Sequence, residues 1–308
     1  MVKIKKLNNK KFLSCLDLSR EEIIRILDLA NDFKNNNLRV KLEDKVLGLI
    51  FDKASTRTRV SFQVAMSRLG GSTIDLSPST SQINRGEPIK DTARVLSRYC
   101  DALAIRTFKQ EHLEEYSNWS TIPIINALTD LEHPCQVLAD FLTIKEEFGR
   151  LDNLVLTFIG DGNNVANSLI LCGSILGVHI KIACPKGFEP NPKLLSKAKL
   201  IADNEKMIEI TNEPKDAVKD AHILYTDVWS SMGEEKQQES KDKKFEGFTI
   251  DRDLLSTAKE EAIVLHCLPA YRGKEITDEI IDCKKSRIFD QAENRLHVQQ
   301  ALLASFLC

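Results

Sequence analysis

Short apolar runs and amphipathic segments alternate along almost the whole chain. Residues 154–159 are continuously apolar apart from Thr157, which is typical of a strand buried on both faces of a parallel sheet. Residues 20–33 instead repeat their apolar side chains at helical spacing. Alternating strands and helices of this kind predict an α/β fold with mainly parallel sheets flanked by helices.

The predicted elements form two successive cycles that are separated near residues 149–153. Short apolar runs predict strands at 46–51, 73–76, 102–106, 124–126, 154–159, 179–183, 223–226 and 262–265. Apolar residues at helical spacing predict helices at 20–33, 60–69, 89–99, 134–148, 167–176, 194–203 and 294–308. The polar and charged stretch 233–246 is predicted to be a mobile loop that closes over bound ligand.

A chain of 308 residues is long enough for two domains of ordinary size. We therefore expect domains at residues 1–149 and 150–290. Residues 291–308 contain regularly spaced apolar side chains and are expected to form a C-terminal helix that packs back on the first domain.

Composition excludes several classes of protein. The formal net charge of -2 provides no overall basic field to attract nucleic acid. No apolar run approaches the ~20 residues of a membrane helix, and the N-terminus has no pattern of a signal or transit peptide. The eight cysteines are scattered without a Cys-x-x-Cys pair, which favours a reducing cytosol over a disulfide framework or a structural zinc site. These features predict a cytoplasmic enzyme.

The most informative segment is Ser55-Thr56-Arg57-Thr58-Arg59, between a predicted strand and a predicted helix. Free N–H groups and the positive end of the helix dipole point at one spot there. Hydroxyl groups and guanidinium forks add donors that suit phosphate oxygens. The segment therefore predicts a site for a phosphate-bearing small molecule. The alternative is an ordinary helix cap followed by two solvent-facing arginines.

The segment 160–165, Gly-Asp-Gly-Asn-Asn-Val, also lies between a strand and a helix. It lacks two features of a dinucleotide fingerprint, because Val165 replaces the third glycine and no acidic residue follows at the end of the next strand. Asn163, Asn164 and Asn167 would instead lie at the mouth of a cleft, where amides could bind a zwitterionic substrate. They could equally serve only as helix caps and turn residues.

Further polar groups lie beside the ends of predicted strands. They are Arg106, His133-Pro134-Cys135-Gln136, Asp227-Val228-Trp229-Ser230-Ser231-Met232-Gly233 and His266-Cys267-Leu268-Pro269. Each group alone is compatible with a cap or a core position. Because parallel strands end at the same edge of a sheet, the groups together predict an active site.

From about residue 10 to the end, the chain resembles the aspartate/ornithine carbamoyltransferase family. The resemblance rests on segments 51–59, 133–136 and 266–269, on Ser81-Gln82, on Asp227 with Ser231-Met232-Gly233, and on Ala292-Glu293-Asn294-Arg295. The combination of Ser-Met-Gly with His-Cys-Leu-Pro is similar to that of the ornithine-specific members.

The resemblance implies a reaction of arginine metabolism. The δ-amine of L-ornithine attacks the carbonyl carbon of carbamoyl phosphate, giving L-citrulline and phosphate. It implies no cofactor and no obligatory metal. It also implies a homotrimer with sites at the subunit interfaces, in which the loop containing Gln82 reaches a neighbouring subunit's site.

The resemblance also assigns residues to the two substrates. Those implied for carbamoyl phosphate are Ser55, Thr56, Arg57, Thr58, Gln82, Arg106, His133, Gln136, Cys267, Leu268 and Arg295. Those implied for ornithine are Asn167, Asp227, Ser231, Met232, Cys267 and Leu268. The implied catalytic residues are Arg57, Arg106, His133 and Cys267. Whether Cys267 or the leaving phosphate accepts the proton of the amine stays open.

Other functions remain as alternatives. Within the family, putrescine or acetylated ornithine could replace ornithine, although the Ser-Met-Gly loop disfavours both. A nicotinamide dehydrogenase would have to tolerate Val165 in its fingerprint. A binding protein that kept the fold without turnover would have no chemical reason to retain Arg57, Arg106, His133 and Cys267 together.

Overall fold

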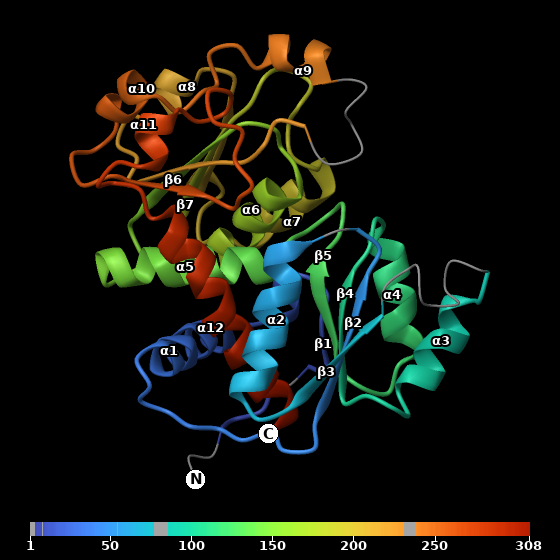
Figure 1. The fold of residues 1–308 in the computed structure, drawn as a ribbon. Helices are drawn as coiled ribbons and strands as arrows, with labels where there is room; N and C mark the ends of the chain where they lie inside the picture. The colour runs from blue at the N-terminus through green and yellow to red at the C-terminus, as the bar shows by residue number, and fades with distance from the viewer. Residues whose placement is uncertain (1–3, 8, 54, 77–85, 231–237) are drawn as a thin grey trace. The chain divides into compact units, whose positions relative to one another are not determined.

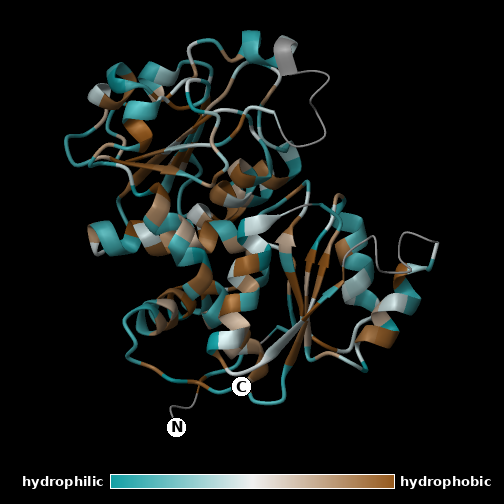
Figure 2. Ribbon diagram, in the orientation of Figure 1, coloured by the Kyte–Doolittle hydropathy of each residue, from teal (hydrophilic) through white to brown (hydrophobic). Residues whose placement is uncertain are grey.

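The computed structural model describes residues 4–7, 9–53, 55–76, 86–230 and 238–308. The chain divides into two compact units, drawn in Figure 1: Met1–Leu142 with Glu293–Cys308, and Thr143–Ala292. Each unit contains one five-stranded parallel sheet with helices packed on it, which confirms the predicted fold class. Figure 2 shows that the hydrophobic residues concentrate in the strands of these sheets.

The sheet of the first unit has the strand order β1-β5-β4-β2-β3. Its strands are β1 (Lys11–Phe12), β2 (Val46–Phe51), β3 (Ser72–Leu76), β4 (Ala102–Arg106) and β5 (Ile124–Leu128). The four longer strands confirm the predicted ones. The sequence analysis missed β1, because two residues are too few to show a periodic pattern.

The helices of the first unit include the predicted ones and two that were not predicted, η1 and α4. They are η1 (Cys15–Asp17), α1 (Arg20–Lys34), α2 (Thr56–Arg68), α3 (Ile89–Leu96), α4 (Gln110–Trp119), the first part of α5 (Pro134–Phe148) and most of α12 (Ile288–Leu307). Helix α4 was missed because only Gln110, Leu113 and Tyr116 of its ten residues are buried. Helix α1 starts where expected, because Ser19 and Glu22 form a capping box.

The two faces of the first sheet bury different residues. Leu103 and Ile105 of β4 belong to an apolar cluster that also contains Ala93 of α3 and Leu113 of α4. Side chains alternate along a strand, so Arg106 projects on the face opposite to Ile105. The pairing of β4 with β5 shifts register between Ile105 and Arg106. The register therefore breaks where the strand ends in a charged residue.

The sheet of the second unit has the order β10-β9-β6-β7-β8. Its strands are β6 (Val155–Ile159), β7 (His179–Ala183), β8 (Ile208–Thr211), β9 (Ile223–Thr226) and β10 (Ile263–His266). Four of them confirm predicted strands. Strand β8 was missed, since only Ile208 of its four residues is buried.

The helices of the second unit differ in how much they bury. They are the end of α5, α6 (Asn164–Leu176), α7 (Pro192–Ile201), η3 (Glu205–Met207), α8 (Pro214–Ala217), α9 (Gln238–Lys244), α10 (Arg252–Thr257), α11 (Asp278–Ile281) and the start of α12. Helix α6 buries eleven of its thirteen residues, and Gly177 ends it in the left-handed conformation at φ 75°.

The predicted mobile loop at 233–246 is partly wrong. Residues Gln238–Lys244 form α9, and Phe245, which follows it, is fully buried against Trp229 and Phe248. Lys241 pairs with Asp161 at 2.7 Å and tethers α9 to the loop after β6. The prediction of a loop did not take account of Phe245, the apolar residue that directly follows α9. Residues 233–237 of the stretch lie outside the described residues.

All eight cysteines lie within the described residues, and none of them forms a disulfide there. No helix in the described part of the chain combines the length and the apolar character needed to cross a membrane.

Gly162 provides a test of packing in the second unit. A Cβ at this position would lie 2.3 Å from the Pro190 nitrogen and 2.6 Å from the Phe188 carbonyl oxygen, both of which are backbone atoms. Backbone cannot rotate away as a side chain does. We therefore expect Gly162→Ala to lower the free energy of unfolding by at least about 1–3 kcal/mol. Urea denaturation measures the change, and an unchanged midpoint and slope would contradict the close contact.

Candidate active site

A first cluster of polar groups lies in the first unit, where β2 leads into α2. The helix starts at Thr56 and not at the predicted residue 60, so Thr56 to Arg59 form its first turn. Ser55 occupies the cap position but makes no side-chain cap hydrogen bond, and the first turn contains no acidic residue. The ordinary-cap interpretation of this segment is therefore wrong for Ser55. Its hydroxyl and the first-turn N–H groups suit an anion.

Arg106 reaches this turn from the neighbouring strand. Its Nη1 donates to Ser55 Oγ at 3.0 Å. Strands β2 and β4 are neighbours at the point where the strand order of the sheet reverses. Ligands of open α/β sheets bind at the carboxyl ends of the strands at such a point. The Arg106–Ser55 contact lies at this position.

Two more helices contribute buried polar groups to the first unit. Arg295 of α12 is 3% exposed, and its Nη2 donates to Thr58 Oγ1 at 2.6 Å. His133 directly precedes α5 and is 5% exposed. Gln136 of α5 is fully buried, and its Nε2 donates to Asp140 Oδ1 at 2.8 Å. This bond orients the amide, and Gln136 Oε1 has no hydrogen-bond partner among the described residues. Gln136 therefore presents an acceptor.

The electrostatics of the first unit favour an anionic ligand. Burial, together with the positive charges of Arg295 and Arg57, lowers the pKa of Arg106 to about 10, so it stays protonated near pH 7. Burial and the charges of Arg295, Arg106 and Arg57 hold the pKa of His133 well below its ordinary value. His133 is therefore a neutral imidazole that can donate one hydrogen bond without carrying charge. A dianion would relieve the repulsion among the guanidinium groups.

A second cluster of polar groups lies in the second unit, at the strand-order reversal of its sheet. Asn163 follows β6, Asp227 follows β9, and these strands are neighbours at that point. Asn163 Nδ2 donates to Asp227 Oδ2 at 2.8 Å. The other end of the same amide caps α6, because Asn163 Oδ1 accepts from the N–H groups of Val165 and Ala166. The helix start therefore fixes the orientation of Asn163.

Cys267 completes this second cluster. It follows β10, is 8% exposed, and its Sγ donates to Asp227 Oδ1 at 2.9 Å. Leu268 comes next with φ 57°, in the left-handed region. The structure thus brings Asp227 and Cys267 together as the sequence analysis expects, and adds Asn163 to them.

Asn167, which the sequence assigns to ornithine, contacts Asn191. It is 4% exposed, and its Oδ1 accepts from the N–H of Asn191 at 3.0 Å. Its neighbour Asn163 is the residue that contacts Asp227. An asparagine between strand and helix signals a cap, but nothing in the sequence shows that the free end of the amide reaches a residue 64 positions away. The assigned residues Gln82, Ser231 and Met232 lie outside the described residues.

Among the described residues, one group could in principle hold a metal ion. The potential ligand atoms of Asp227, His266 and Cys267 lie within 4.8 Å of one another. Both ring nitrogens of His266 already have partners, since Nδ1 accepts from the N–H of Leu268 and Nε2 lies 3.1 Å from Glu275. The potential ligand atoms of this group are therefore engaged in hydrogen bonds to protein groups.

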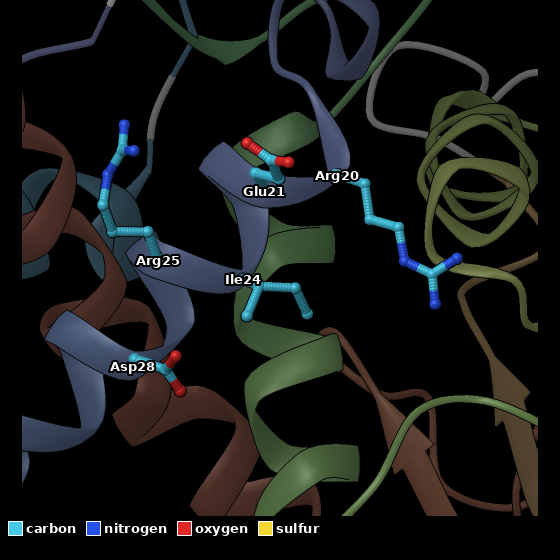
Figure 3. Close-up of a pocket in the computed structure, with 5 residues that line it drawn as sticks. All are labelled: Arg20, Glu21, Ile24, Arg25 and Asp28. Atoms are coloured by element: carbon cyan, nitrogen blue, oxygen red, sulfur yellow. The ribbon is translucent and has the colours of Figure 1, made fainter.

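A surface cavity of about 390 Å³ lies elsewhere, on α1. Figure 3 shows its lining residues, which are Arg20, Glu21, Ile24, Arg25 and Asp28. Both signs of charge occur on this short stretch of one helix, and none of the site residues described above lines the cavity.

Fold and site define a class of protein. Two parallel sheets carry polar clusters at their strand-order reversals, one cationic and one built around a carboxylate and a thiol, which is typical of a two-domain α/β enzyme with small, charged substrates. Family models match both parts: the carbamoyl-P binding domain of aspartate/ornithine carbamoyltransferases at residues 10–146 and the Asp/Orn binding domain at residues 152–306.

Known proteins resemble the chain over its full length. The ornithine carbamoyltransferase of Prochlorococcus marinus subsp. pastoris is 69% identical over 307 residues, covering 100% of both chains. The crystal structure of ornithine carbamoyltransferase from Pyrococcus furiosus superposes with a TM-score of 0.94 at 44% identity, covering 99% of both chains. An anabolic ornithine carbamoyltransferase from Campylobacter jejuni has a TM-score of 0.90 at 44% identity, covering 96% of this chain and 98% of that one. The chain belongs to the aspartate/ornithine carbamoyltransferase family.

Glu132, next to His133, is a buried acid that the sequence analysis missed. It is 1% exposed, and its Oε2 accepts from the N–H of Cys15 at 3.0 Å. Burial raises its pKa from an ordinary value of 4.5 to about 7, although hydrogen bonds from Ser14 and Cys15 oppose the rise. Glu132 thus links the segment just before α5 to Cys15, the first residue of η1.

This raised pKa makes stability depend on pH. The folded protein holds the proton of Glu132 more tightly than the unfolded chain, so its stabilising contribution is complete below pH 4.5 and is lost as pH rises through 7. The uncharged Glu132→Gln variant should gain stability relative to the parent between pH 4.5 and 8, by on the order of 3 kcal/mol. Denaturant titrations at both ends of this range measure it. A pH-independent difference would mean that Glu132 does not titrate in this range.

Proposed function

We propose that this chain transfers the carbamoyl group of carbamoyl phosphate to the δ-amine of L-ornithine, giving L-citrulline and phosphate. The observation that carries the proposal is the chemistry of the first cluster. It combines three guanidinium groups and a neutral imidazole with Gln136 Oε1, an acceptor that has no partner within the described part of the chain. Carbamoyl phosphate has matching groups: a dianionic phosphate, a carbonyl oxygen that needs donors, and an NH₂ that needs an acceptor.

The two domains divide the substrates between them. Residues 1–149 bind carbamoyl phosphate, residues 150–290 bind ornithine, and residues 291–308 return to the first domain. The matched family domains support this division by their descriptions. The hydrogen bond between Arg295 and Thr58 supports the place of the C-terminal helix.

Carbamoyl phosphate is held at the start of α2. Ser55, Thr56, Arg57 and Thr58 bind the phosphate through hydroxyls, backbone N–H groups and the guanidinium, with Gln82, Arg295, Cys267 and Leu268 completing the pocket. Arg106, His133 and Thr58 donate to the carbonyl oxygen, where negative charge grows as the amine attacks. Each such donor contributes ~2.7–4 kcal/mol in known oxyanion holes. Gln136 accepts from the NH₂ and thereby fixes the plane of the carbamoyl group.

Ornithine is held at the end of β9. Asp227 binds the α-ammonium, while Asn167, Ser231 and Met232 bind the α-carboxylate. Cys267 and the Leu268 carbonyl orient the δ-amine. The bond from Asn163 supports this assignment, because it holds one carboxylate oxygen of Asp227 in place.

The reaction breaks the bond between the carbonyl carbon and the phosphate oxygen after the δ-nitrogen has attacked. A free alkylamine has a pKa near 10.4, so it must lose a proton before it attacks. A partly desolvated pocket lowers that pKa. The amine proton passes either to Cys267 or to the departing phosphate. In both routes, one group takes up the one proton that the amine loses.

The working protein is a cytoplasmic homotrimer with active sites at its subunit interfaces, and it acts in arginine biosynthesis. Val60 of α2 and Ile74 of the edge strand β3 are 49% and 45% exposed, and such apolar side chains are suited to a contact between copies. The anabolic enzyme from C. jejuni among the similar structures supports the biosynthetic direction.

A substrate panel tests the proposed function. The protein is incubated with carbamoyl phosphate and, in turn, L-ornithine, L-aspartate, putrescine or N-acetylornithine, and the carbamoylated product is measured. We expect rapid product formation with ornithine, at least about 100-fold above the other amines, because the other ligands lose one charged contact or more. Preference for another amine would overturn the ornithine assignment. Absence of turnover with every amine would support a binding protein.

Arg57 provides a test of the phosphate half. It is exposed in the structure, so Arg57→Ala should leave the unfolding midpoint unchanged. Loss of charge-assisted hydrogen bonds, at about 1.5–3 kcal/mol, should weaken carbamoyl-phosphate binding about 10- to 100-fold in calorimetry. Arg59→Ala is the matched control, because Arg59 pairs with Asp75 and lies over the ring of Phe51. Equal loss in both variants would contradict a specific role for Arg57.

A further inference from the structure

His266 and Glu275 form a buried pair behind the amino-acid half of the site. His266 is the last residue of β10 and is completely buried, and Glu275 is 1% exposed. Their side chains meet at 3.1 Å, from His266 Nε2 to Glu275 Oε1. The reaction described above uses neither residue.

The hydrogen bonds around His266 determine its tautomer. Its Nδ1 lies 2.8 Å from the backbone nitrogen of Leu268 and must accept, because an amide N–H can only donate. The proton of the neutral ring is therefore on Nε2 and is donated to Glu275 Oε1. The same carboxylate oxygen accepts from the N–H of Tyr271 at 2.5 Å.

The backbone on both sides of the pair is also anchored. The N–H of His266 donates to Gln291 Oε1 at 2.9 Å, and Gln291 Nε2 in turn donates to the Tyr225 hydroxyl at 3.0 Å. The carbonyl of Glu275 accepts from the N–H of Ile250 at 2.9 Å. The pair is thus a fixed support.

The segment held by this support has a conformation that leucine rarely adopts. Leu268 has φ 57°, and a side chain with a Cβ is disfavoured there by about 1–2 kcal/mol. The bond from Leu268 N–H to His266 Nδ1 compensates for this cost. The same turn brings Cys267 Sγ to 2.9 Å from Asp227 Oδ1. The geometry of the thiol and of the Leu268 carbonyl therefore depends on the His266 ring.

We propose that His266 and Glu275 are positioning residues for the amino-acid substrate. Glu275 orients the His266 ring, the ring holds the Leu268 N–H, and this bond fixes the Cys267 thiol and the Leu268 carbonyl where they meet the δ-amine. The proposal rests on the proposed function, since it assumes that these two groups contact ornithine. It adds a pair that acts on the reaction only through its neighbours.

Variants of Glu275 separate positioning from general stability. Glu275→Ala removes the acceptor, and Glu275→Gln keeps an oxygen that can accept from His266 and Tyr271. Arg272→Ala is the control on the same loop, because Arg272 makes only exposed ion pairs with Asp278 and Asp282. All three are assayed for the KM of ornithine, for kcat and for the calorimetric Kd of carbamoyl phosphate.

We expect Glu275→Ala to raise the KM of ornithine or lower kcat by at least about ten-fold, with the Kd of carbamoyl phosphate unchanged. Glu275→Gln should restore most of the loss, and Arg272→Ala should behave as the parent. If Glu275→Ala does not fold, Glu275→Asp, which draws the carboxylate back from His266, must show the same selective loss. Parent-like kinetics in these variants, or parallel weakening of both substrates, would overturn the proposal.

Thiol labelling provides a readout that does not need turnover. Iodoacetamide modification of each cysteine is followed by peptide mass spectrometry in the parent and in Glu275→Ala. Cys172 and Cys184 are buried in the same unit and serve as internal references. Faster labelling of Cys267 alone supports positioning, whereas an equal rise at all three cysteines indicates a general loss of stability and overturns it. If the parent protein does not carbamoylate ornithine, the proposed function fails, and this labelling result still decides whether the pair positions Cys267.

Discussion

All strands of each sheet run parallel, so all of them end at the same edge. Where the strand order reverses, the segments that follow the two neighbouring strands turn away in opposite directions. Side chains at or shortly after the ends of these strands then face one another. In the first unit these side chains are Ser55 and Arg106, and in the second they are Asn163 and Asp227. Cys267 adds a further donor to the second of these clusters, through its bond to Asp227. The constraint is topological, and the chemistry depends on which residues the sequence places at the four strand ends.

The sequence predicts most of the sheet residues, because buried parallel strands are almost continuously apolar. Strands β2 and β4 have the predicted bounds, and both are almost wholly buried. Three of the elements that were not predicted bury too little to leave a pattern: β1 has two residues, β8 buries one side chain, and α4 is mostly polar. Helix α9 was not predicted because its own residues are polar and charged. The buried side chain that ends this segment, Phe245, follows the helix and does not belong to it.

The residues of the candidate site also fall into two groups, those that the sequence indicates and those that it does not. The sequence indicates residues whose role depends on their own position in an element, such as Arg106 at the end of a strand or Ser55 before a helix. It does not indicate residues whose role depends on a distant partner. Glu132 contacts the backbone of Cys15, 117 positions away, and Asn163 contacts Asp227, 64 positions away. Pairing across such distances is decided by the order of the strands, which local periodicity does not encode.

The two clusters also differ in how their charges are satisfied before any substrate arrives. In the second unit Asp227 already accepts from Asn163, Cys267 and the N–H of Val228, so its carboxylate is fixed by neutral donors. In the first unit the guanidinium groups of Arg106, Arg295 and Arg57 act on one another and on His133 as like charges. Burial and the neighbouring positive charges both disfavour the charged form of Arg106, so a bound anion would be stabilising there. An oxygen dianion removes the repulsion and leaves the hydrogen-bond donors already aligned, whereas a neutral molecule of the same shape would only fill space. The first cluster is therefore suited to its proposed ligand by charge, and the second by the geometry of a carboxylate that its neighbours hold in place.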